Sequence, residues 1–438
     1  MNNIGRLGKR EDLTFKANLR QSRYGWLRLT PAYSVHQVEA LLDCGEERTQ
    51  VLDPFCGTGT TALVCAERGI PCDTTDINPF LVWLASVKTR PYESRDIDAF
   101  LSASGQVVAA MRVTSAPVAW LPALHQIEKW WDCSTLGTLG RAMDTIALLS
   151  ESVGEKAVDL LKVAFCRTMM EHAHVSFGHQ SMSFQKRAKS GPKSLVLPGF
   201  EENPVIATWD VAVSTLASAA RQPIKMRPRV LLADAKTLEG LEPARYSRVI
   251  TSPPYPNRMS YIRELRPYMY WLGFLGGGRA AGELDWQAIG GTWGCATSNL
   301  GKWQADSTVT IPFRGFPVIV RKIRNHSEIL SRYVHKYFVD MYQHCRVLVN
   351  LVRPGGAVQY IVGNSKFYDV LLPVEEIYAA MFESVGFEAV NWEATRKRTS
   401  KKELYEFVVS ARRPAGLVGS AQRGNSPASA QPRSNDFP

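Results

Sequence analysis

The stretch Thr49-Gln-Val-Leu-Asp53-Pro-Phe-Cys-Gly57-Thr-Gly59-Thr-Thr-Ala62 decides the fold class. Its first five residues are typical of a short buried strand, and its two glycines predict a tight turn. A helical pattern follows to Arg68 and ends at Gly69, a residue type preferred just after a helix. Residues 70–76 then predict a second strand. The order strand, helix, strand indicates a parallel sheet with right-handed crossovers.

Beyond this unit, residues 95–228 have the apolar spacing of helices. Two predicted helices each carry one apolar face: Leu136, Leu139, Met143 and Ile146 in the first, and Val158, Leu161, Phe165 and Met169 in the second. Strand patterns return at residues 230–234 and 248–251. We therefore expect a helical insertion, after which the sheet continues.

The remaining chain is predicted to complete the sheet. Residues 276–324 show no clear periodicity, which predicts a long irregular loop. An amphipathic helix, a strand and a second helix follow. Residues 387–393 and 403–410 then predict a terminal hairpin with a basic connection. Residues 413–438 are rich in Gly, Ser, Pro, Ala and Gln, so we expect a disordered tail.

Composition narrows the class of protein. The 438 residues are 45% hydrophobic and 21% charged, which is typical of a globular protein with one large or two smaller domains. A net charge of +11 favours polyanionic partners such as nucleic acid. Because no membrane-spanning stretch or secretory signal is visible, we expect no membrane role and a cytoplasmic location. The 8 cysteines form no C-x-x-C pair, and we expect reduced thiols and no metal site.

Asp53 distinguishes between the ligands that the glycine turn could hold. The pattern from Gly57 to Ala62, with Asp76 ending the next strand, fits a dinucleotide fingerprint in which the acid holds a ribose hydroxyl. A carboxylate at Asp53 would repel a pyrophosphate but attract the ammonium and sulfonium groups of S-adenosylmethionine. This disfavours a nicotinamide-dependent oxidoreductase. The alternative is that Asp53 only caps the turn after its strand.

A second motif, Ser252-Pro253-Pro254-Tyr255, follows a predicted strand at the edge where open α/β sheets bind ligands. Prolines leave carbonyls that no strand ladder uses, serine adds an acceptor and tyrosine adds a stacking face. These groups suit an exocyclic amine on a planar base. The alternative is a polyproline turn, which needs neither the preceding strand nor the glycine turn.

Together these motifs resemble the amino-group DNA methyltransferases that use S-adenosylmethionine. The resemblance covers most of residues 15–411 and rests on Asp53-Pro-Phe-Cys-Gly-Thr-Gly-Thr-Thr61, Asp76-Ile-Asn-Pro79 and Ser252-Pro-Pro-Tyr255. It implies a Rossmann-like α/β fold with a mostly parallel seven-stranded sheet and a C-terminal antiparallel hairpin. The Ser-Pro-Pro-Tyr form is similar to members that methylate cytosine N4, whereas adenine-N6 members more often begin with Asp or Asn.

The resemblance also implies site residues. Those for the cofactor are Asp53, Pro54, Phe55, Gly57, Thr58, Gly59, Asp76, Ile77 and, after the strand at 230–234, Asp234. Those for catalysis are Ser252, Pro253, Pro254 and Tyr255. Phe15 to Pro31 would flank the methionine end of the cofactor. The target base of double-stranded DNA would be flipped out and stacked on Tyr255, while Ser252 and the Pro253 carbonyl accept the amine hydrogens. Because stacking uses the ring, we expect the Tyr255 hydroxyl to be dispensable.

These assignments divide the chain into four segments. Residues 1–94 form the N-terminal segment and the cofactor-binding half, and 95–228 form the helical insertion, a candidate target-recognition region. Residues 229–412 form the catalytic half with the loop insertion 276–324, and 413–438 form the tail. The basic run Arg396, Lys397, Arg398, Lys401 and Lys402 is predicted to contact DNA phosphates, unless it only keeps a hairpin end soluble.

Other functions remain open alternatives. They are an adenine-N6 DNA methyltransferase, an RNA base methyltransferase, although no RNA-binding module is evident, and a non-catalytic DNA-binding protein with this fold. Methylation at cytosine C5 would need a cysteine nucleophile. Pro71-Cys72 lies inside the strand that leads to Asp76, which favours a buried structural thiol. Membership of a restriction-modification system would add a cognate restriction endonuclease as a partner.

Overall fold

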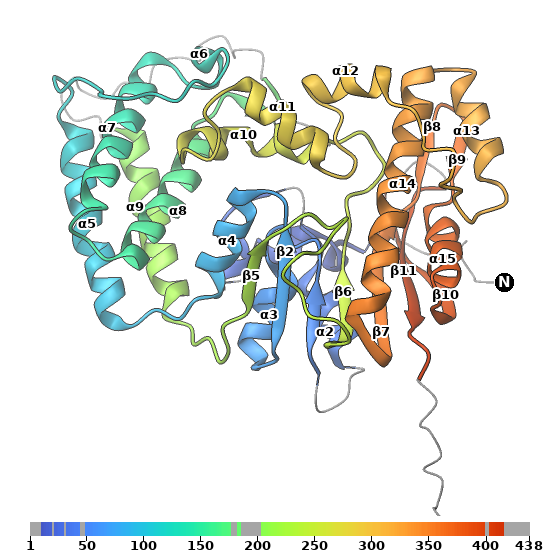
Figure 1. The fold of residues 1–438 in the computed structure, drawn as a ribbon. Helices are drawn as coiled ribbons and strands as arrows, with labels where there is room; N and C mark the ends of the chain where they lie inside the picture. The colour runs from blue at the N-terminus through green and yellow to red at the C-terminus, as the bar shows by residue number, and fades with distance from the viewer. Residues whose placement is uncertain are drawn as a thin grey trace, which may run out of the picture.

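The computed structural model describes residues 10–19, 22–29, 32–43, 49–176, 182–184, 203–398 and 403–415. At its centre lies a 7-stranded sheet in the order β10-β11-β7-β6-β1-β2-β5 (Figure 1). The strands are β1 (Val51–Asp53), β2 (Cys72–Asp76), β5 (Arg229–Leu232), β6 (Tyr246–Thr251), β7 (Val352–Gly363), β10 (Glu388–Lys397) and β11 (Tyr405–Arg412). Strands β7, β6, β1, β2 and β5 are parallel, and β11 is antiparallel to β7 and β10. The predicted Rossmann-like fold class and the terminal hairpin are confirmed.

The first strand, turn and helix form as the sequence predicts. β1 leads through the glycine turn into α3 (Thr60–Arg68), and β2 leads into α4 (Pro79–Thr89). Gly59, with φ 78°, occupies the left-handed region directly before α3. A Cβ atom there would lie 3.0 Å from the Cβ of Ala85 in α4. Glycine therefore allows both the turn and the close packing of these two helices.

Helices cover both faces of the sheet, because successive strand residues point to opposite sides. Ile250, Ile361 and Val408 face a core with α2 (Val35–Asp43) and α3. Their neighbours Val249, Tyr360 and Val409 face a second core with α14 (Glu328–Leu351) and α15 (Val374–Ser384). The described chain also contains short elements: η2 (Glu11–Leu13), α1 (Phe15–Asn18), η3 (Ser22–Gly25), β3 (Val175–Ser176), β4 (Ser183–Phe184), β8 (Ser365–Phe367) and β9 (Val370–Leu372).

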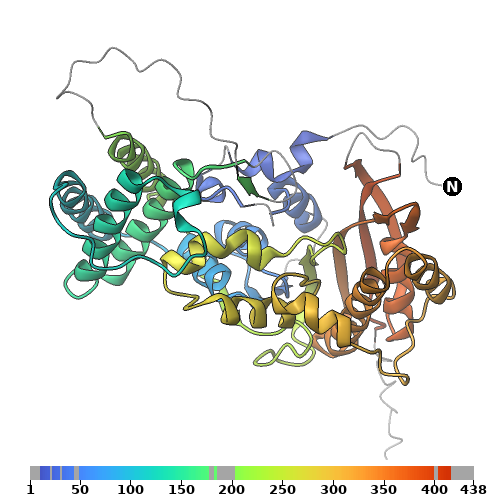
Figure 2. The ribbon, with the colours of Figure 1, turned by 90° about the horizontal axis from the view of Figure 1, so that it is seen from above.

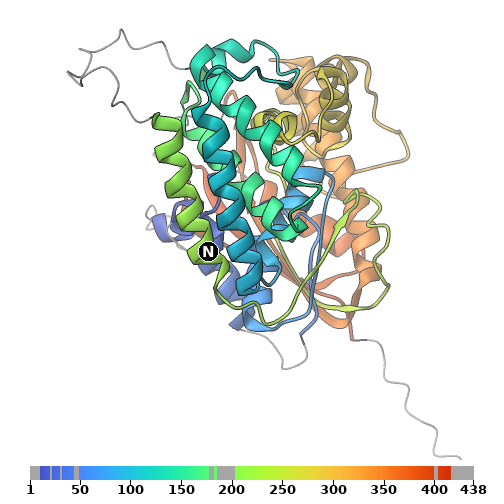
Figure 3. The ribbon, with the colours of Figure 1, turned by 90° about the vertical axis from the view of Figure 1, so that its left-hand side faces the viewer.

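The predicted helices of residues 95–228 are present and pack beside the sheet (Figure 1), and Figure 3 shows them from that side. They are α5 (Ser94–Arg112), α6 (Ile127–Trp130), α7 (Cys133–Leu149), α8 (Glu155–Glu171) and α9 (Pro204–Ala220), which we call the helical block. The predicted apolar faces of α7 and α8 are buried in its core. No helix in the described part of the chain is long and apolar enough to cross a membrane.

The expectation of an irregular loop at residues 276–324 is wrong. After α10 (Tyr261–Trp271), this segment forms α11 (Gly278–Gln287), α12 (Cys295–Lys302) and α13 (Phe316–Arg324), and α10 to α12 lie across the carboxyl ends of the parallel strands (Figures 1 and 2). α11 buries only Ala281, Gly282 and Asp285. Because it packs through small and polar residues, it lacks the apolar periodicity that would predict a helix.

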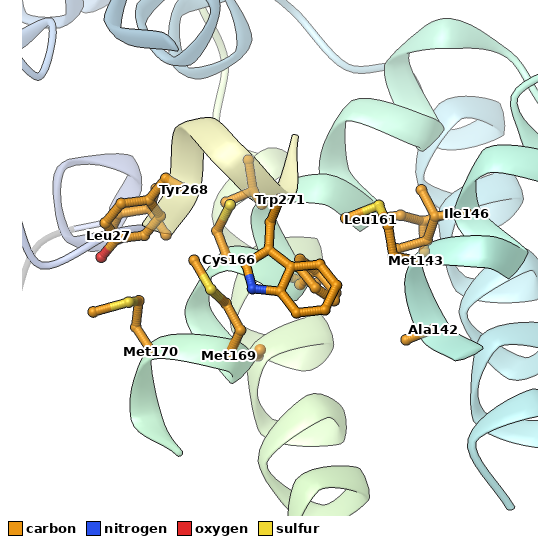
Figure 4. Close-up of a cluster of buried hydrophobic side chains, with 14 of the residues drawn as sticks. Leu27, Ala142, Met143, Ile146, Leu161, Cys166, Met169, Met170, Tyr268 and Trp271 are labelled. Atoms are coloured by element: carbon orange, nitrogen blue, oxygen red, sulfur yellow. The ribbon is translucent and has the colours of Figure 1, made fainter. Parts of the chain in front are cut away.

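Trp271, at the end of α10, anchors this segment in the helical block. Its side chain is 1% exposed and lies among Cys166 and Met169 of α8 and Met143 of α7 (Figure 4). Its ring centroid is 5.1 Å from that of Phe165. Helix α10, which follows the Ser-Pro-Pro-Tyr motif, is therefore held at its C-terminal end by the helical block.

Arg23, in η3, is completely buried and joins the helical block to the sheet domain. Its guanidinium donates five hydrogen bonds of 2.7 to 3.3 Å, all to main-chain carbonyls. Two acceptors, Lys88 and Arg90, lie where α4 ends, before the block begins. The other three, Ala219, Ala220 and Gln222, lie where α9 ends. One side chain thus holds the two ends of the block together.

Candidate active site

A cavity of about 510 Å³ lies at the carboxyl ends of the parallel strands. Of the residues predicted for the site, those that line it are Pro54, Phe55, Gly57, Asp76, Ile77, Asp234, Ser252, Pro253, Pro254, Tyr255, Arg396, Lys397 and Arg398. They come from the ends of β1, β2, β5 and β6 and from the hairpin strand β10. The structure therefore brings both motifs and the basic residues of β10 to one cavity. Lys401, Lys402 and tail residues 416–438 lie outside the described residues.

Asp53 lies behind the cavity rather than on its wall. The carboxylate is completely buried, with Oδ1 accepting hydrogen bonds from the Thr251 hydroxyl at 2.6 Å and the Phe55 amide at 3.1 Å. Oδ2 accepts from the Tyr33 hydroxyl at 3.1 Å. Burial raises the pKa of Asp53 to about 7. Its contacts match the capping alternative, and they also tie the end of β1 to the end of β6.

Thr58 and Gly59 are likewise absent from the cavity wall formed by the described residues. The Thr58 carbonyl accepts a hydrogen bond of 2.9 Å from Nζ of Lys88, which is buried beneath the turn. Burial lowers the pKa of Lys88 to about 8. Thr58 and Lys88 support the glycine turn on the side away from the cavity, whereas Gly57 forms part of the cavity wall.

Asp76 connects two loops at the cavity wall. Its Oδ2 accepts a hydrogen bond from the Gly57 amide and its Oδ1 accepts one from the Asn78 amide, each at 2.9 Å. Burial raises the pKa of this carboxyl to about 6. Each carboxylate oxygen can accept a further hydrogen bond, so a ligand hydroxyl could bind without displacing either amide.

Asp234 lies two residues after β5, on the same wall. Its Oδ1 accepts a hydrogen bond of 2.9 Å from the Lys236 amide, and its Oδ2 lies 3.0 Å from Nζ of the same lysine. Lys236 Nζ also donates to the Gln287 carbonyl at 2.7 Å. Sequence reasoning missed Lys236, which connects the predicted adenine-binding acid to the end of α11.

The Ser252 hydroxyl has its single hydrogen engaged, because it donates to the Ile361 carbonyl at 3.0 Å. Its oxygen is therefore available only as an acceptor. The Pro254 carbonyl accepts a hydrogen bond of 2.7 Å from Tyr337, whose hydroxyl lies 2.8 Å from that of Tyr378. No described residue donates to the Pro253 carbonyl. The motif thus presents two acceptors, the Ser252 hydroxyl oxygen and the Pro253 carbonyl.

Tyr255 has partners that sequence reasoning did not identify. Its hydroxyl donates to Glu406 Oε2 at 3.3 Å, and the guanidinium carbon of Arg398 lies 4.8 Å from its ring centroid. Arg396 forms an ion pair of 2.6 Å with the same glutamate. Two of the arginines predicted to contact DNA phosphates therefore have protein partners beside Tyr255.

Two further regions of the chain contribute to the cavity wall. Phe15 to Pro31 was expected to flank the cofactor, but Lys16 is its only described lining residue. Its neighbours in sequence contribute Arg10, Leu13, Thr14, Ala32 and Tyr33, and the second insertion contributes Asp285, Ala288, Ile289, Gly290 and Gly291. No described residue of the helical block lines the cavity. Nor do the described residues contain a cluster of His, Cys, Asp or Glu able to hold a metal ion.

Comparison with known proteins adds one distant relationship. No protein-family model matches the chain. The type II methyltransferase M.AvaI of Nostoc sp. (strain PCC 7120) is 24% identical over an alignment of 413 residues that covers 86% of this chain and 82% of that protein. M.AvaI of Anabaena variabilis gives the same figures. The chain is a distant relative of a type II methyltransferase.

Among solved structures, the rRNA methyltransferase aviRa from Streptomyces viridochromogenes covers 87% of this chain. The match includes 86% of the aviRa chain, with 12% identity and a TM-score of 0.27. A likeness of this size carries no argument about function.

Proposed function

We propose that this protein is an S-adenosylmethionine-dependent DNA methyltransferase that modifies the N4 amine of cytosine in double-stranded DNA. The observation that carries the proposal is the pair of acceptors formed by the Ser252 hydroxyl oxygen and the Pro253 carbonyl. An exocyclic amine has two hydrogens to donate, and these acceptors share a cavity with Asp76. The distant relationship to a type II methyltransferase supports the methyl-transfer part of the proposal.

The cofactor would occupy the end of the cavity formed by the loops after β1, β2 and β5. Asp76 has acceptor capacity for ribose hydroxyls, and Gly57 has no side chain that would block the approach of a ligand. Phe55 and Ile77 supply apolar surface for adenine, and Asp234 supplies an acceptor for its amine. When bound, S-adenosylmethionine supplies an electrophilic methyl group. Asp53 would act indirectly, by holding the ends of β1 and β6 in place.

The chain's own residues would promote transfer by positioning rather than by covalent chemistry. Tyr255 would stack with a base that has left the duplex, and the two acceptors would bind its amine hydrogens. These hydrogen bonds draw the nitrogen lone pair out of conjugation with the ring, which makes it more nucleophilic. Neither acceptor is a strong base, so the amine would lose its proton only after the nitrogen had become positively charged. Such positioning and electrostatic effects are sufficient for large rate enhancements.

The proposal can be tested in a host that lacks DNA methylation. We expect DNA from cells that express the protein to contain N4-methylcytosine, detected by mass spectrometry of digested nucleosides. DNA from cells that express Ser252→Ala serves as the control. N6-methyladenine would instead indicate the adenine class, and methylation confined to RNA would contradict a DNA substrate. Sequencing of modified DNA would then identify the sites that a cognate restriction endonuclease should cut.

A further inference from the structure

Glu406 lies at the beginning of β11, between two other strands. The strand register pairs it with Arg396 of β10 and with Gly363 of β7. The residue is only 3% exposed, and a buried carboxylate is costly unless its charge is paired. Arg396 supplies this pairing with two hydrogen bonds, from Nε to Oε1 at 3.0 Å and from Nη2 to Oε2 at 2.6 Å.

Two more side chains donate to the same carboxylate. Gln37 of α2 donates from Nε2 to Oε1 at 3.1 Å, and the Tyr255 hydroxyl donates to Oε2 at 3.3 Å. Burial, with a smaller contribution from the negative charge of Glu406, raises the pKa of Tyr255 far above its usual value. The hydroxyl therefore keeps its hydrogen and acts as a donor. Glu406 fixes the outer end of the tyrosine, the atom farthest from its backbone.

A second contact fixes the face of the same ring. The Arg398 guanidinium lies over Tyr255 and donates from Nη1 to the Asn364 carbonyl at 2.7 Å. At Gly363 a Cβ atom would lie 2.5 Å from Arg398 Nη1 and 2.9 Å from Tyr255 Cε2. Any side chain at Gly363 would thus displace the guanidinium, the ring or both. With one face covered by Arg398, the opposite face is the one on which a planar base can stack.

We propose that Glu406 is a positioning residue that acts through the Tyr255 hydroxyl. Together with Arg398, it holds the tyrosine ring in the orientation that receives the flipped base. This inference rests on the proposed function and extends it to residues outside the two sequence motifs. It also replaces the expectation that the Tyr255 hydroxyl is dispensable.

A double-mutant cycle with Tyr255→Phe and Glu406→Gln tests the inference. The assay is single-turnover methylation of unmethylated genomic DNA at saturating S-adenosylmethionine. Loss of the hydroxyl's hydrogen bond should slow Tyr255→Phe about 3- to 10-fold, and Glu406→Gln, which also weakens the pair with Arg396, should be slowed at least as much. If Glu406 acts through the hydroxyl, the double variant should be no slower than the slower single variant. Multiplied losses, or a Tyr255→Phe variant with the wild-type rate, would overturn the inference.

Further measurements separate positioning from general stability. S-adenosylmethionine affinity, measured by calorimetry, should be unchanged in both single variants, whereas a structural role would weaken it. Tyr255→Phe should also keep the wild-type Tm, because it leaves the pair between Glu406 and Arg396 intact. Glu242→Gln is a surface control, because it removes the charge of an exposed, arginine-paired glutamate near the opposite end of β6. It should leave the rate unchanged.

Arg398→Met provides a second route if Glu406→Gln does not fold. It leaves the pair between Glu406 and Arg396 intact and removes only the guanidinium that covers the ring. The single-turnover rate should fall about 2- to 30-fold, the range expected for a cation–π contact. An unchanged rate would overturn the proposed support of the ring. A wild-type protein that methylates no nucleic acid would reject the proposed function and this inference together, whereas an active wild type with multiplied losses would reject only the inference.

Discussion

The two ends of the cavity are held in place by different kinds of partner. The end that contains Asp76 and Asp234 is called the acidic end, and the end that contains Arg396, Lys397 and Arg398 the basic end. At the acidic end, main-chain amides hold the carboxylates, because Gly57 and Asn78 donate to Asp76 and Lys236 donates to Asp234. At the basic end, side chains from separate elements fix one another, since Glu406 binds Arg396, Gln37 and Tyr255. The acidic end therefore forms with its own loops, whereas the basic end requires the complete sheet and α2.

This difference predicts where each end is sensitive to substitution. A main-chain donor persists when its side chain is replaced, so the acidic end depends mainly on the carboxylates themselves. At the basic end the partners of Glu406 are all side chains, so substitutions distant in sequence should affect the same tyrosine ring. Measurements of stability, ligand affinity and turnover can test this contrast.

The largest effect should come from Asp53→Asn, through stability rather than direct ligand contact. The pKa of Asp53 is raised from 3.8 to about 7, so the folded protein holds this proton more tightly than the unfolded chain. Its ionisation therefore lowers the free energy of unfolding as the pH rises from about 4 to 7. The shift of about 3 pH units corresponds to at most about 4 kcal/mol at 1.36 kcal/mol per unit. Urea unfolding of Asp53→Asn over this pH range should show a flatter profile than the wild type.

The control for this measurement is Asp369→Asn, because Asp369 is fully exposed. Its pH profile should follow that of the wild type. Parallel profiles for all three proteins would show that the buried Asp53 carboxyl does not contribute this pH dependence.

Asp76→Ala should weaken S-adenosylmethionine binding by about 1.5–3 kcal/mol, or roughly 10- to 150-fold in Kd. The substitution removes acceptors for the ribose and leaves the amides of Gly57 and Asn78 without their partner. Calorimetric titration measures the change, with Asp369→Ala as the control. Unchanged affinity would reject this location for the cofactor. Binding of NAD in its place would favour the oxidoreductase alternative.

Tyr255→Ala should give the opposite pattern, with slower methyl transfer and unchanged cofactor affinity. Loss of base stacking costs about 1–3 kcal/mol, which corresponds to a single-turnover rate lower by roughly 5- to 150-fold. If Tyr255→Ala and Asp76→Ala changed the same quantity, the two ends of the cavity would not serve separate ligands. A wild-type rate for Tyr255→Ala would exclude the stacking role.

The smallest effect concerns the salt dependence of DNA binding. Arg396 is paired with Glu406, so Arg396→Ala should hardly change the slope of log K against log salt. Lys397 lines the cavity, and no acidic side chain in the described part of the chain pairs with it. Lys397→Ala should flatten the slope by about 0.9, the value for one phosphate contact. Fluorescence-anisotropy titrations over a salt series would decide, and parallel lines for wild type and Lys397→Ala would exclude the contact.

Local features of the chain were predictable from sequence. The turn from β1 into α3 carries its own glycines, and Asp76 is held by amides within a few residues of the motifs. The apolar faces of α7 and α8 repeat at helical spacing, so these helices were also evident. Helix α11 was not, because it packs through small and polar residues. Helix α13 did carry a signal that sequence reasoning missed, since Phe316, Val320 and Ile323 lie on one buried face.

The basic end of the cavity could not be predicted in the same way. Glu406 meets Tyr255 and Gln37 across sequence separations of 151 and 369 residues. Such pairs depend on strand register and on the position of α2, which local patterns do not specify. One signal was present: Glu406 lies on the second predicted strand of the hairpin, and Arg396, of opposite charge, comes three residues after the first. The structure extends that strand, β10, to Lys397, so Arg396 pairs with Glu406 rather than lying in the connection. Their ion pair argues against a contact between Arg396 and a DNA phosphate.

The five hydrogen bonds of Arg23 have a consequence for how this architecture could be re-engineered. Because this guanidinium binds carbonyls on both sides of the helical block, the chain leaves the sheet domain and returns to it at neighbouring points. Segments whose ends lie close together can be exchanged or removed with little disturbance to the host domain. We expect a short linker from Arg90 to Gln222 to be able to rejoin the chain if the block is removed. Such a variant would need new carbonyl acceptors for Arg23 and polar replacements for the side chains that the block buries, Trp271 among them.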